Sequence, residues 1–239
     1  MVVVEMFFAA NSSMHSSTSN HHSDTIILLS GPPSCGKTSL LFQFALNSIS
    51  TEDDGMGSRP SVVFICCRRR LESRPPCLLK GIDRSSGAFH RIQMKYVDDD
   101  EGIKKYFAAF HLHDTLPAAV IIDDFGDFFD ERNCQQRYGN ARGRDMAMVR
   151  VLALCQSAML HANKKAHCKL LLSDMHLGDS SRLLYIYKRW VSSLFTIQGD
   201  GSGSFLLKNS IPVEDCRVAK YSIALQYLVL NGITEGAGS

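Results

Sequence analysis

The sequence lacks paired cysteine motifs, long apolar runs and a strong excess of charge of either sign. Its eight cysteines include no C-x-x-C pair, so neither a zinc site nor a thioredoxin-like motif is expected. No apolar run approaches the roughly 20 residues that a membrane-spanning helix needs. The apolar start, residues 1–10, has no basic region and contains Glu5, which argues against a secretory signal. The formal net charge of +2 neither favours nor excludes nucleic acid, so a basic surface would have to come from local clusters.

The composition is that of an ordinary folded domain. The chain has 239 residues, of which 45% are hydrophobic and 21% charged, which suits one α/β domain with a substantial core. We expect the scattered cysteines to be reduced and mostly buried. Residues 11–24 are rich in Ser, Asn and His and cannot bury enough apolar surface to become ordered. We therefore predict a flexible N-terminal tail over residues 1–24 and one folded domain over residues 25–239.

Short apolar runs alternate with helical patterns along most of the chain. This alternation is typical of a parallel sheet covered by helices on both faces. The expected strands are 25–30, 61–67, 91–97, 118–123 and 168–174, and the expected helices are 37–49, 100–112 and 145–164. Residues 189–210 predict two further strands joined by the turn at 199–203, and residues 217–230 predict another strand or a helix. The predicted fold class is α/β, with a mostly parallel sheet, flanking helices and antiparallel C-terminal strands.

A glycine-rich loop stands between the first predicted strand and the first predicted helix. Residues 31–38, GPPSCGKT, match the phosphate-loop pattern G-x-x-x-x-G-K-[ST] in full. Its glycines permit tight turns that aim backbone N–H groups at phosphate oxygens, and the start of the helix adds a favourable field. We expect Lys37 to reach the β- and γ-phosphates and Thr38 to bind Mg²⁺. The predicted nucleotide-binding residues are Gly31, Pro32, Pro33, Ser34, Cys35, Gly36, Lys37, Thr38 and Ser39. The alternative is a glycine-rich turn that only connects two elements.

An acidic pair ends the fourth predicted strand. In phosphate-loop enzymes an aspartate at this place holds the Mg²⁺, and Asp123 is the first acid after the apolar run. The alternative is a polar strand end that faces solvent. Asp124-Phe125-Gly126 also spells a protein-kinase triplet, but the other kinase motifs are missing. Residues 163–166 lack the aspartate that would read guanine, so ATP is the expected nucleotide.

The order of these parts resembles the core of RecA-type recombinases and their paralogues. In that family a basic loop, a long apolar helix and another strand follow the magnesium-binding strand, as in DDFGDFFDERNCQQRYGNARGRD, residues 145–164 and KLLLSD. The resemblance covers about residues 25–230. The short chain and its GPPSCGKTSLL opening are most similar to the SWIM-associated ATPases, the small recombinase paralogues of Shu-type complexes.

The resemblance implies a P-loop NTPase with a RecA-like core that takes ATP and Mg²⁺. It further implies a nuclear protein of homologous recombination repair. Its expected partners are a zinc-binding SWIM-domain protein, a RecA-type recombinase and single-stranded DNA. The pattern F-x-x-A, by which recombinase subunits dock on one another, occurs at residues 7–10 and again at 42–45.

The chain departs from the family at the catalytic base. Recombinases carry a glutamate just past the second strand, where this chain has Arg68, and Glu72 lies several residues further on. Loss of a well-placed general base costs about 10²–10⁴-fold in rate. We therefore expect a slow ATPase whose catalytic residues are Lys37 and Asp124. Asp124 would substitute for the missing base, as in some AAA+ ATPases, and the alternative is that it is a capping or surface residue.

Basic residues gather in the segment after Asp124. In the resembling family this segment carries the first DNA-binding loop, and flexible arginines with Tyr138 could contact phosphates and stack on a base. The candidate DNA-binding residues are Arg132, Arg137, Arg142 and Arg144. The alternative is a solvated loop whose charges are balanced by neighbouring acids. A second candidate cluster, which could also belong to the core, contains Arg182, Tyr185, Tyr187, Lys188, Arg189 and Trp190.

Three classes of function remain from the sequence. The first is an ATP-binding, weakly hydrolysing recombination subunit that associates with single-stranded DNA. The second is an adaptor in which the nucleotide is structural or absent. The third is another ATPase or kinase, but an AAA+ protein needs a helical lid after its core, and residues 189–210 do not predict one.

Overall fold

A single ten-stranded sheet runs through the part of the chain that the structure, a computed structural model, describes: residues 4–8, 25–50, 60–83, 85–175, 181–210 and 217–235. The strand order is β3-β10-β9-β8-β7-β1-β6-β5-β2-β4. The strands are β1 (Ile26–Gly31), β2 (Val62–Cys66), β3 (Leu78–Leu79), β4 (Ile92–Tyr96), β5 (Ala119–Ile122), β6 (Lys169–Met175), β7 (Ser193–Gly199), β8 (Ser204–Asn209), β9 (Arg217–Ala224) and β10 (Tyr227–Glu235).

Strands β7, β1, β6, β5, β2 and β4 pair in parallel, and β7 to β10 pair antiparallel in chain order. The central strands are apolar on both faces: β1, β2 and β5 are buried along their whole length. Such strands require cover on both sides, and the helices provide it. The predicted α/β class, with a mostly parallel sheet and antiparallel C-terminal strands, is confirmed.

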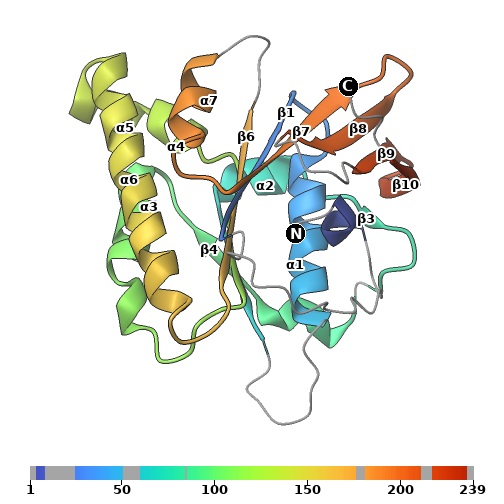
Figure 1. The fold of residues 1–239 in the computed structure, drawn as a ribbon, viewed down its shortest axis with the longest axis horizontal. Helices are drawn as coiled ribbons and strands as arrows, with labels where there is room; N and C mark the ends of the chain where they lie inside the picture. The colour runs from blue at the N-terminus through green and yellow to red at the C-terminus, as the bar shows by residue number, and fades with distance from the viewer. Residues whose placement is uncertain are drawn as a thin grey trace.

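Helices cover the two faces of the sheet unequally (Figure 1). One face carries α3 and α6, while α1 lies on the other. The helical segments are η1 (Val4–Phe7), α1 (Lys37–Ser50), α2 (Arg68–Ser73), η2 (Gly87–Arg91), α3 (Asp100–Ala108), η3 (Phe110–Leu112), α4 (Asp127–Asp130), α5 (Arg132–Tyr138), α6 (Ala141–Ala162) and α7 (Ser181–Tyr187).

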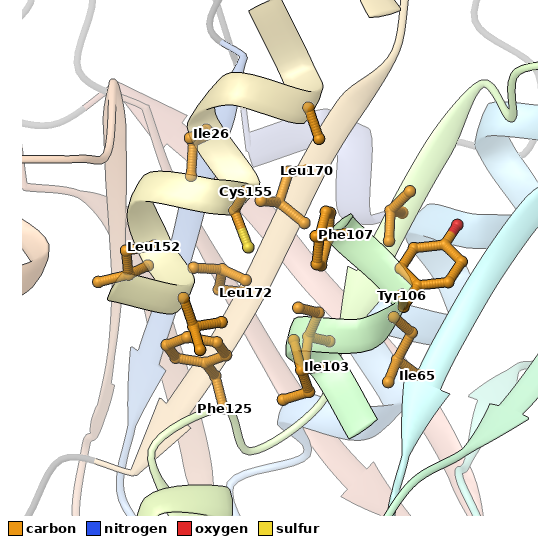
Figure 2. Close-up of a cluster of buried hydrophobic side chains, with 14 of the residues drawn as sticks. Ile26, Ile65, Ile103, Tyr106, Phe107, Phe125, Leu152, Cys155, Leu170 and Leu172 are labelled. Carbon is orange, nitrogen blue, oxygen red and sulfur yellow. The ribbon is translucent and has the colours of Figure 1, made fainter. Parts of the chain in front are cut away.

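The core is divided by the sheet into two apolar clusters. Figure 2 shows the cluster between the sheet and α3 and α6, where Leu152 and Cys155 of α6 and Phe107 of α3 meet Leu170 and Leu172 of β6. The cluster on the other face joins α1 to the opposite sides of the same strands. Among the described cysteines, those at 35, 66, 134, 155 and 168 are buried, as expected. No helix in the described ranges is long and apolar enough to cross a bilayer.

The predicted and observed elements differ mainly in four places. The predicted helix 100–112 is divided into α3, which ends at Ala108, and the short η3. Helix α6 begins at Ala141 instead of residue 145, because the Asn140 side chain caps it by accepting a hydrogen bond from Gly143 N. The segment expected to be a flexible basic loop forms α4, α5 and the start of α6. Residues 217–230 belong to the hairpin β9–β10, which turns at Leu225 and Gln226, both at positive φ.

The predicted flexible tail is wrong for residues 4–8. The Phe7 side chain is fully buried and lies edge-on to Phe195, with ring centroids 5.3 Å apart, and it also contacts Phe44 of α1. The Asn47 side chain of α1 donates a hydrogen bond to the Met6 carbonyl at 2.9 Å. The start of the chain is therefore part of the core on the α1 face, while residues 9–24 lie outside the described residues.

Candidate functional site

The loop at residues 31–38 lies at the carboxyl end of β1 and runs directly into α1. Its path requires special backbone conformations at two positions, with φ of 60° at Ser34 and 87° at Gly36. A Cβ atom at Gly31 would lie 2.8 Å from Cβ of Ile197 and 2.9 Å from Sγ of Cys35, so glycine is the residue that fits there. The expected place of this loop between a strand and a helix is confirmed.

Side chains of strand β9 pack against the loop at Cys35 and Gly36. The Tyr221 hydroxyl donates a hydrogen bond of 2.7 Å to the Cys35 carbonyl, and both residues are buried. A Cβ atom at Gly36 would lie 2.7 Å from Cδ1 of Ile223. Tyr221 also packs against Phe8, with ring centroids 5.7 Å apart. The C-terminal hairpin therefore contacts the loop directly, and the N-terminal segment packs against the tyrosine that makes this contact.

Lys37, which belongs to the loop, and Ser39, which follows it, lie in the first turn of α1. The Lys37 ammonium is 3.3 Å from each of the carbonyl oxygens of Gly31 and Pro32, and the side chain is buried. Ser39 accepts a hydrogen bond of 2.9 Å from Cys77 N, so its hydroxyl faces a neighbouring segment. The loop thus holds its lysine by backbone carbonyls.

Asp123 connects three elements of the site. It follows β5, and its Oδ2 accepts a hydrogen bond of 2.7 Å from the Thr38 hydroxyl at the start of α1. Its Oδ1 accepts one of 2.8 Å from the Ser173 hydroxyl of β6. Strand β6 lies between β1 and β5, so Asp123 and Ser173 come from adjacent strands and Thr38 from the helix that follows the loop after β1. The predicted pair of Thr38 and Asp123 is thus brought together, and Ser173 joins it.

The electrostatic state of Asp123 follows from its burial. Desolvation raises the pKa of the Asp123 carboxyl to about 6, and the nearby charge of Asp124 acts in the same direction. The hydrogen bonds from Thr38 and Ser173 and the charge of Lys37 oppose this rise. A buried acid whose charged form is under-solvated attracts a cation, which would lower its pKa again.

Asp124 has an unusual backbone conformation for an aspartate. Its φ is 50°, and its N–H donates a hydrogen bond of 2.8 Å to the Ser173 hydroxyl. The next amide, Phe125 N, donates one of 2.8 Å to the Ser173 carbonyl. The chain therefore turns sharply after Asp123 along the end of β6, which places Asp124 beside the loop instead of extending β5.

A second buried acid, Asp174, lies on the other side of this turn. Only 5% of Asp174 is exposed, and a Cβ atom at Gly126 would come within 2.6 Å of its Oδ1. Burial raises the pKa of the Asp174 carboxyl to about 6, and the charges of Asp127 and Asp124 contribute to the rise. Ser173 and Asp174 were not predicted as site residues, because the sequence shows them only as the end of another strand. Predicting Ser173 and Asp174 as site residues would have required knowing that β6 lies next to β5 in the sheet.

The segment after β2 holds arginine where the resembling family has a glutamate. Arg70 of α2 donates to Asp127 at 2.5 Å and to Glu131 at 2.7 Å, which fixes α2 against α4. Arg68 forms an ion pair with Glu72 at 3.6 Å on the surface. Two of the three arginines of α2, Arg68 and Arg70, are thus paired with neighbouring acids.

Two of the four arginines predicted to contact DNA form ion pairs with acids of neighbouring helices. Arg137 pairs with Asp99 and with the buried Asp100 of α3, and Arg144 lies 3.5 Å from Asp130. The remaining two, Arg132 and Arg142, are exposed. The expectation of a flexible loop is wrong here, because two of its arginines hold helices α5 and α6 in place through ion pairs.

Arg142 borders an open groove between α6 and α7. The groove has a volume of about 720 Å³, and its lining is largely apolar. Met146 and Tyr185 are 48% and 68% exposed within it, and Lys188 lies at its edge. The groove therefore brings one residue of the first predicted DNA-binding cluster next to two residues of the second. Tyr187, by contrast, is fully buried in the core.

Within the described ranges, no group of three or more His, Cys, Asp or Glu residues is arranged to hold a metal ion by itself. Asp123 and Thr38 could supply two oxygen ligands, and the rest of a coordination shell would come from water and nucleotide. A scan against protein-family models found no match, and a search of curated proteins found none either.

Proposed function

We propose that the chain is a P-loop ATPase with a RecA-like core, which binds ATP with Mg²⁺ and hydrolyses it slowly. The observation that carries the proposal is the hydrogen bond between Thr38 and Asp123, which joins the glycine-rich loop to the acid two strands away. A turn that merely connected β1 to α1 would not need the buried Asp123 carboxylate beside the Thr38 hydroxyl, because burying a charged group costs free energy.

The loop residues fit a triphosphate. Positive φ at Ser34 and Gly36 and the close contacts at Gly31 give a tight backbone curve at the start of a helix, which favours anions. Lys37 would exchange its two carbonyl contacts for phosphate oxygens. The wider set that would surround the nucleotide is Gly31, Pro32, Pro33, Ser34, Cys35, Gly36, Lys37, Thr38 and Ser39.

Asp123 and Thr38 fit Mg²⁺ for a similar reason. Both offer hard oxygen atoms at one point, and burial raises the pKa of the Asp123 carboxyl, which a bound cation would lower again. The ion would supply charge neutralisation between the phosphates. The chain's own part is to hold the carboxylate and the hydroxyl at hydrogen-bond distance from each other.

Slow hydrolysis follows from the missing glutamate. In this proposal Asp124 is the carboxylate that orients water, held beside the loop by its bond to Ser173. Arg68 and Arg70 of α2 are paired with acids, and an arginine, which stays protonated, cannot serve as the base. We expect turnover about 10²–10⁴-fold below that of an ATPase with a well-placed base.

The test is ATP turnover by the wild-type chain and by Lys37→Ala and Asp124→Asn, with and without single-stranded DNA. The proposal expects slow turnover that Lys37→Ala abolishes and Asp124→Asn reduces. ATP binding without any turnover would leave an adaptor with a structural nucleotide. Turnover that survives Lys37→Ala would contradict the proposed site.

For the biological setting we propose homologous recombination repair in the nucleus, with a SWIM-domain zinc protein and a RecA-type recombinase as partners. The support is the order of motifs in the sequence and the strand arrangement, with the loop strand separated from the acid-bearing strand by β6. Co-purification of the tagged chain, followed by identification of the bound proteins, tests this part.

For single-stranded DNA we propose the groove between α6 and α7. Exposed Tyr185 offers a ring on which a base can stack, and Arg142 and Lys188 can reach phosphates. Replacing Arg142 and Lys188 by alanine should weaken binding of single-stranded DNA. The slope of log K against the logarithm of the salt concentration should become less steep by about 0.7 for each lost phosphate contact. Lys164→Ala, beyond the other end of α6, is the matched control. An unchanged salt dependence would reject the groove.

A further inference from the structure

Ser173 of β6 forms three hydrogen bonds with residues 123–125, the segment that follows β5. Its hydroxyl donates to Oδ1 of Asp123 at 2.8 Å and accepts from the N–H of Asp124 at 2.8 Å. Its carbonyl accepts from the N–H of Phe125 at 2.8 Å. The side chain is completely buried, so water does not replace these bonds.

The two hydroxyl bonds act on different features of the acids. The bond to Asp123 fixes the rotation of that carboxylate, so that its other oxygen meets Thr38. The bond from Asp124 supports a backbone conformation with φ of 50°, which is uncommon for residues other than glycine. One hydroxyl therefore sets both the direction of Asp123 and the turn that carries Asp124.

We infer that Ser173 is a positioning residue for the Mg²⁺-binding arrangement of Asp123 and Thr38. The inference rests on the proposed function and names a residue that the phosphate-loop pattern does not contain. Without the hydroxyl, Asp123 keeps its bond to Thr38 but can rotate, and a buried oxygen and a buried N–H lose their partners. The affinity for nucleotide should then fall mainly when Mg²⁺ is part of the complex.

The experiment titrates Mg²⁺ at a fixed concentration of a fluorescent ATP, with Ser173→Ala, Ser173→Cys and Ser173→Thr. We expect the Mg²⁺ concentration for half-maximal binding to rise about tenfold in Ser173→Ala, as for the loss of a hydrogen bond to a charged group. Ser173→Cys should show a similar rise, because a thiol is a weak donor of nearly the same size. Ser173→Thr retains the hydroxyl and should restore the wild-type Mg²⁺ requirement.

Ser193→Ala is the matched control, since Ser193 is a buried serine of the neighbouring region of the sheet, on β7. It should leave the Mg²⁺ requirement unchanged. Binding of the nucleotide in the presence of EDTA should change less than twofold in every variant. A purely structural role for Ser173 would lower the melting temperature and weaken binding equally with and without Mg²⁺, and that result would overturn the inference.

The failure of this inference is distinguishable from that of the proposed function. If the wild-type chain binds ATP in a Mg²⁺-dependent way and Ser173→Ala has the same Mg²⁺ requirement, only the role of Ser173 is wrong. If the wild-type chain binds no ATP at any Mg²⁺ concentration, the proposed function is wrong and the inference is wrong with it.

Discussion

Buried aspartates end two neighbouring strands, and each one costs stability in the absence of a counter-charge. Asp123 has hydrogen bonds from Thr38 and Ser173, whereas Asp174 lies against Gly126 with the hydroxyl-bearing Tyr187 and the acids Asp124 and Asp127 around it. A carboxyl whose pKa is raised by burial prefers its neutral form in the folded state. The folded protein therefore binds a proton at Asp174 more tightly than the unfolded chain does.

We predict that Asp174→Asn increases the free energy of unfolding at pH 7.5 by about 1–3 kcal/mol. The pKa of Asp174 rises from 3.8 to about 6 on folding, so its ionisation costs stability that builds up between these two pH values and is complete above about pH 6. The gain should shrink as the pH falls towards 4, where the wild-type carboxyl is protonated in the folded state. Urea unfolding at pH 7.5 and 4.5 measures both values. Asp114→Asn, at an exposed position, is the control, and a gain that grows on acidification would contradict the prediction.

At this scale the sequence predicted the residues that belong to recognised motifs. Thr38 and Asp123 were expected to meet, since a known pattern names both, and they lie within hydrogen-bond distance. Ser173 and Asp174 could not be predicted, because their role depends on β6 lying between β1 and β5. A strand order of this kind is decided by tertiary packing and leaves no mark on the local sequence.

Among the helices, α5 depends on ion pairs as much as on apolar packing. Arg137 at its last turn pairs with Asp99 and Asp100 at the start of α3, and Asp100 is 1% exposed. Asp99 also caps α3 by accepting hydrogen bonds from the N–H groups of Glu101 and Gly102. A basic residue that looked available for DNA is therefore committed to holding two helices together.

We predict that Arg137→Ala lowers the free energy of unfolding by about 2–3 kcal/mol, because it leaves the buried Asp100 without a counter-charge. Arg132→Ala, on the same helix, should cause little change, since Arg132 is exposed. Chemical unfolding of the two variants measures the difference. Equal stability of both, together with a loss of DNA binding in Arg137→Ala, would restore the original assignment of Arg137 to a DNA surface.

Element boundaries were predicted well where a local signal exists. The first strand and helix agree within one residue, because the glycine-rich loop separates them clearly. The hairpin β9–β10 was not predicted as such, since its turn at Leu225 and Gln226 has neither glycine nor asparagine. Helices α4 and α5 are short and stabilised by contacts with α2, α3 and α6, which the polar sequence of residues 124–144 does not reveal.

Over the whole molecule, the N-terminal segment packs beside α1 and strand β9. The N-terminal segment η1 packs on α1, and Arg217 at the start of β9 donates to Glu5 at 2.5 Å (Figure 1). Tyr221 then connects this region to the loop at Cys35. The sequence predicted the parallel half of the sheet. It did not predict where the apolar residues 1–10, which precede the polar residues 11–24, would pack.

We predict that Phe7→Ala lowers the free energy of unfolding by about 3–5 kcal/mol, the usual cost of deleting a fully buried ring. Leu112→Ala, at a position 71% exposed, should have little effect and serves as the control. Thermal and urea unfolding measure both variants. If Phe7→Ala is as stable as the wild type, residues 4–8 do not contribute to the core as described.

Calorimetric titration of ATP with Mg²⁺ into the wild-type chain and into Lys37→Ala tests the central claim most directly. A phosphate loop completed by Lys37, Thr38 and Asp123 predicts saturable heat of binding below millimolar nucleotide, lost in Lys37→Ala and reduced when Mg²⁺ is removed. Absence of heat from the wild-type chain at millimolar ATP would contradict the account.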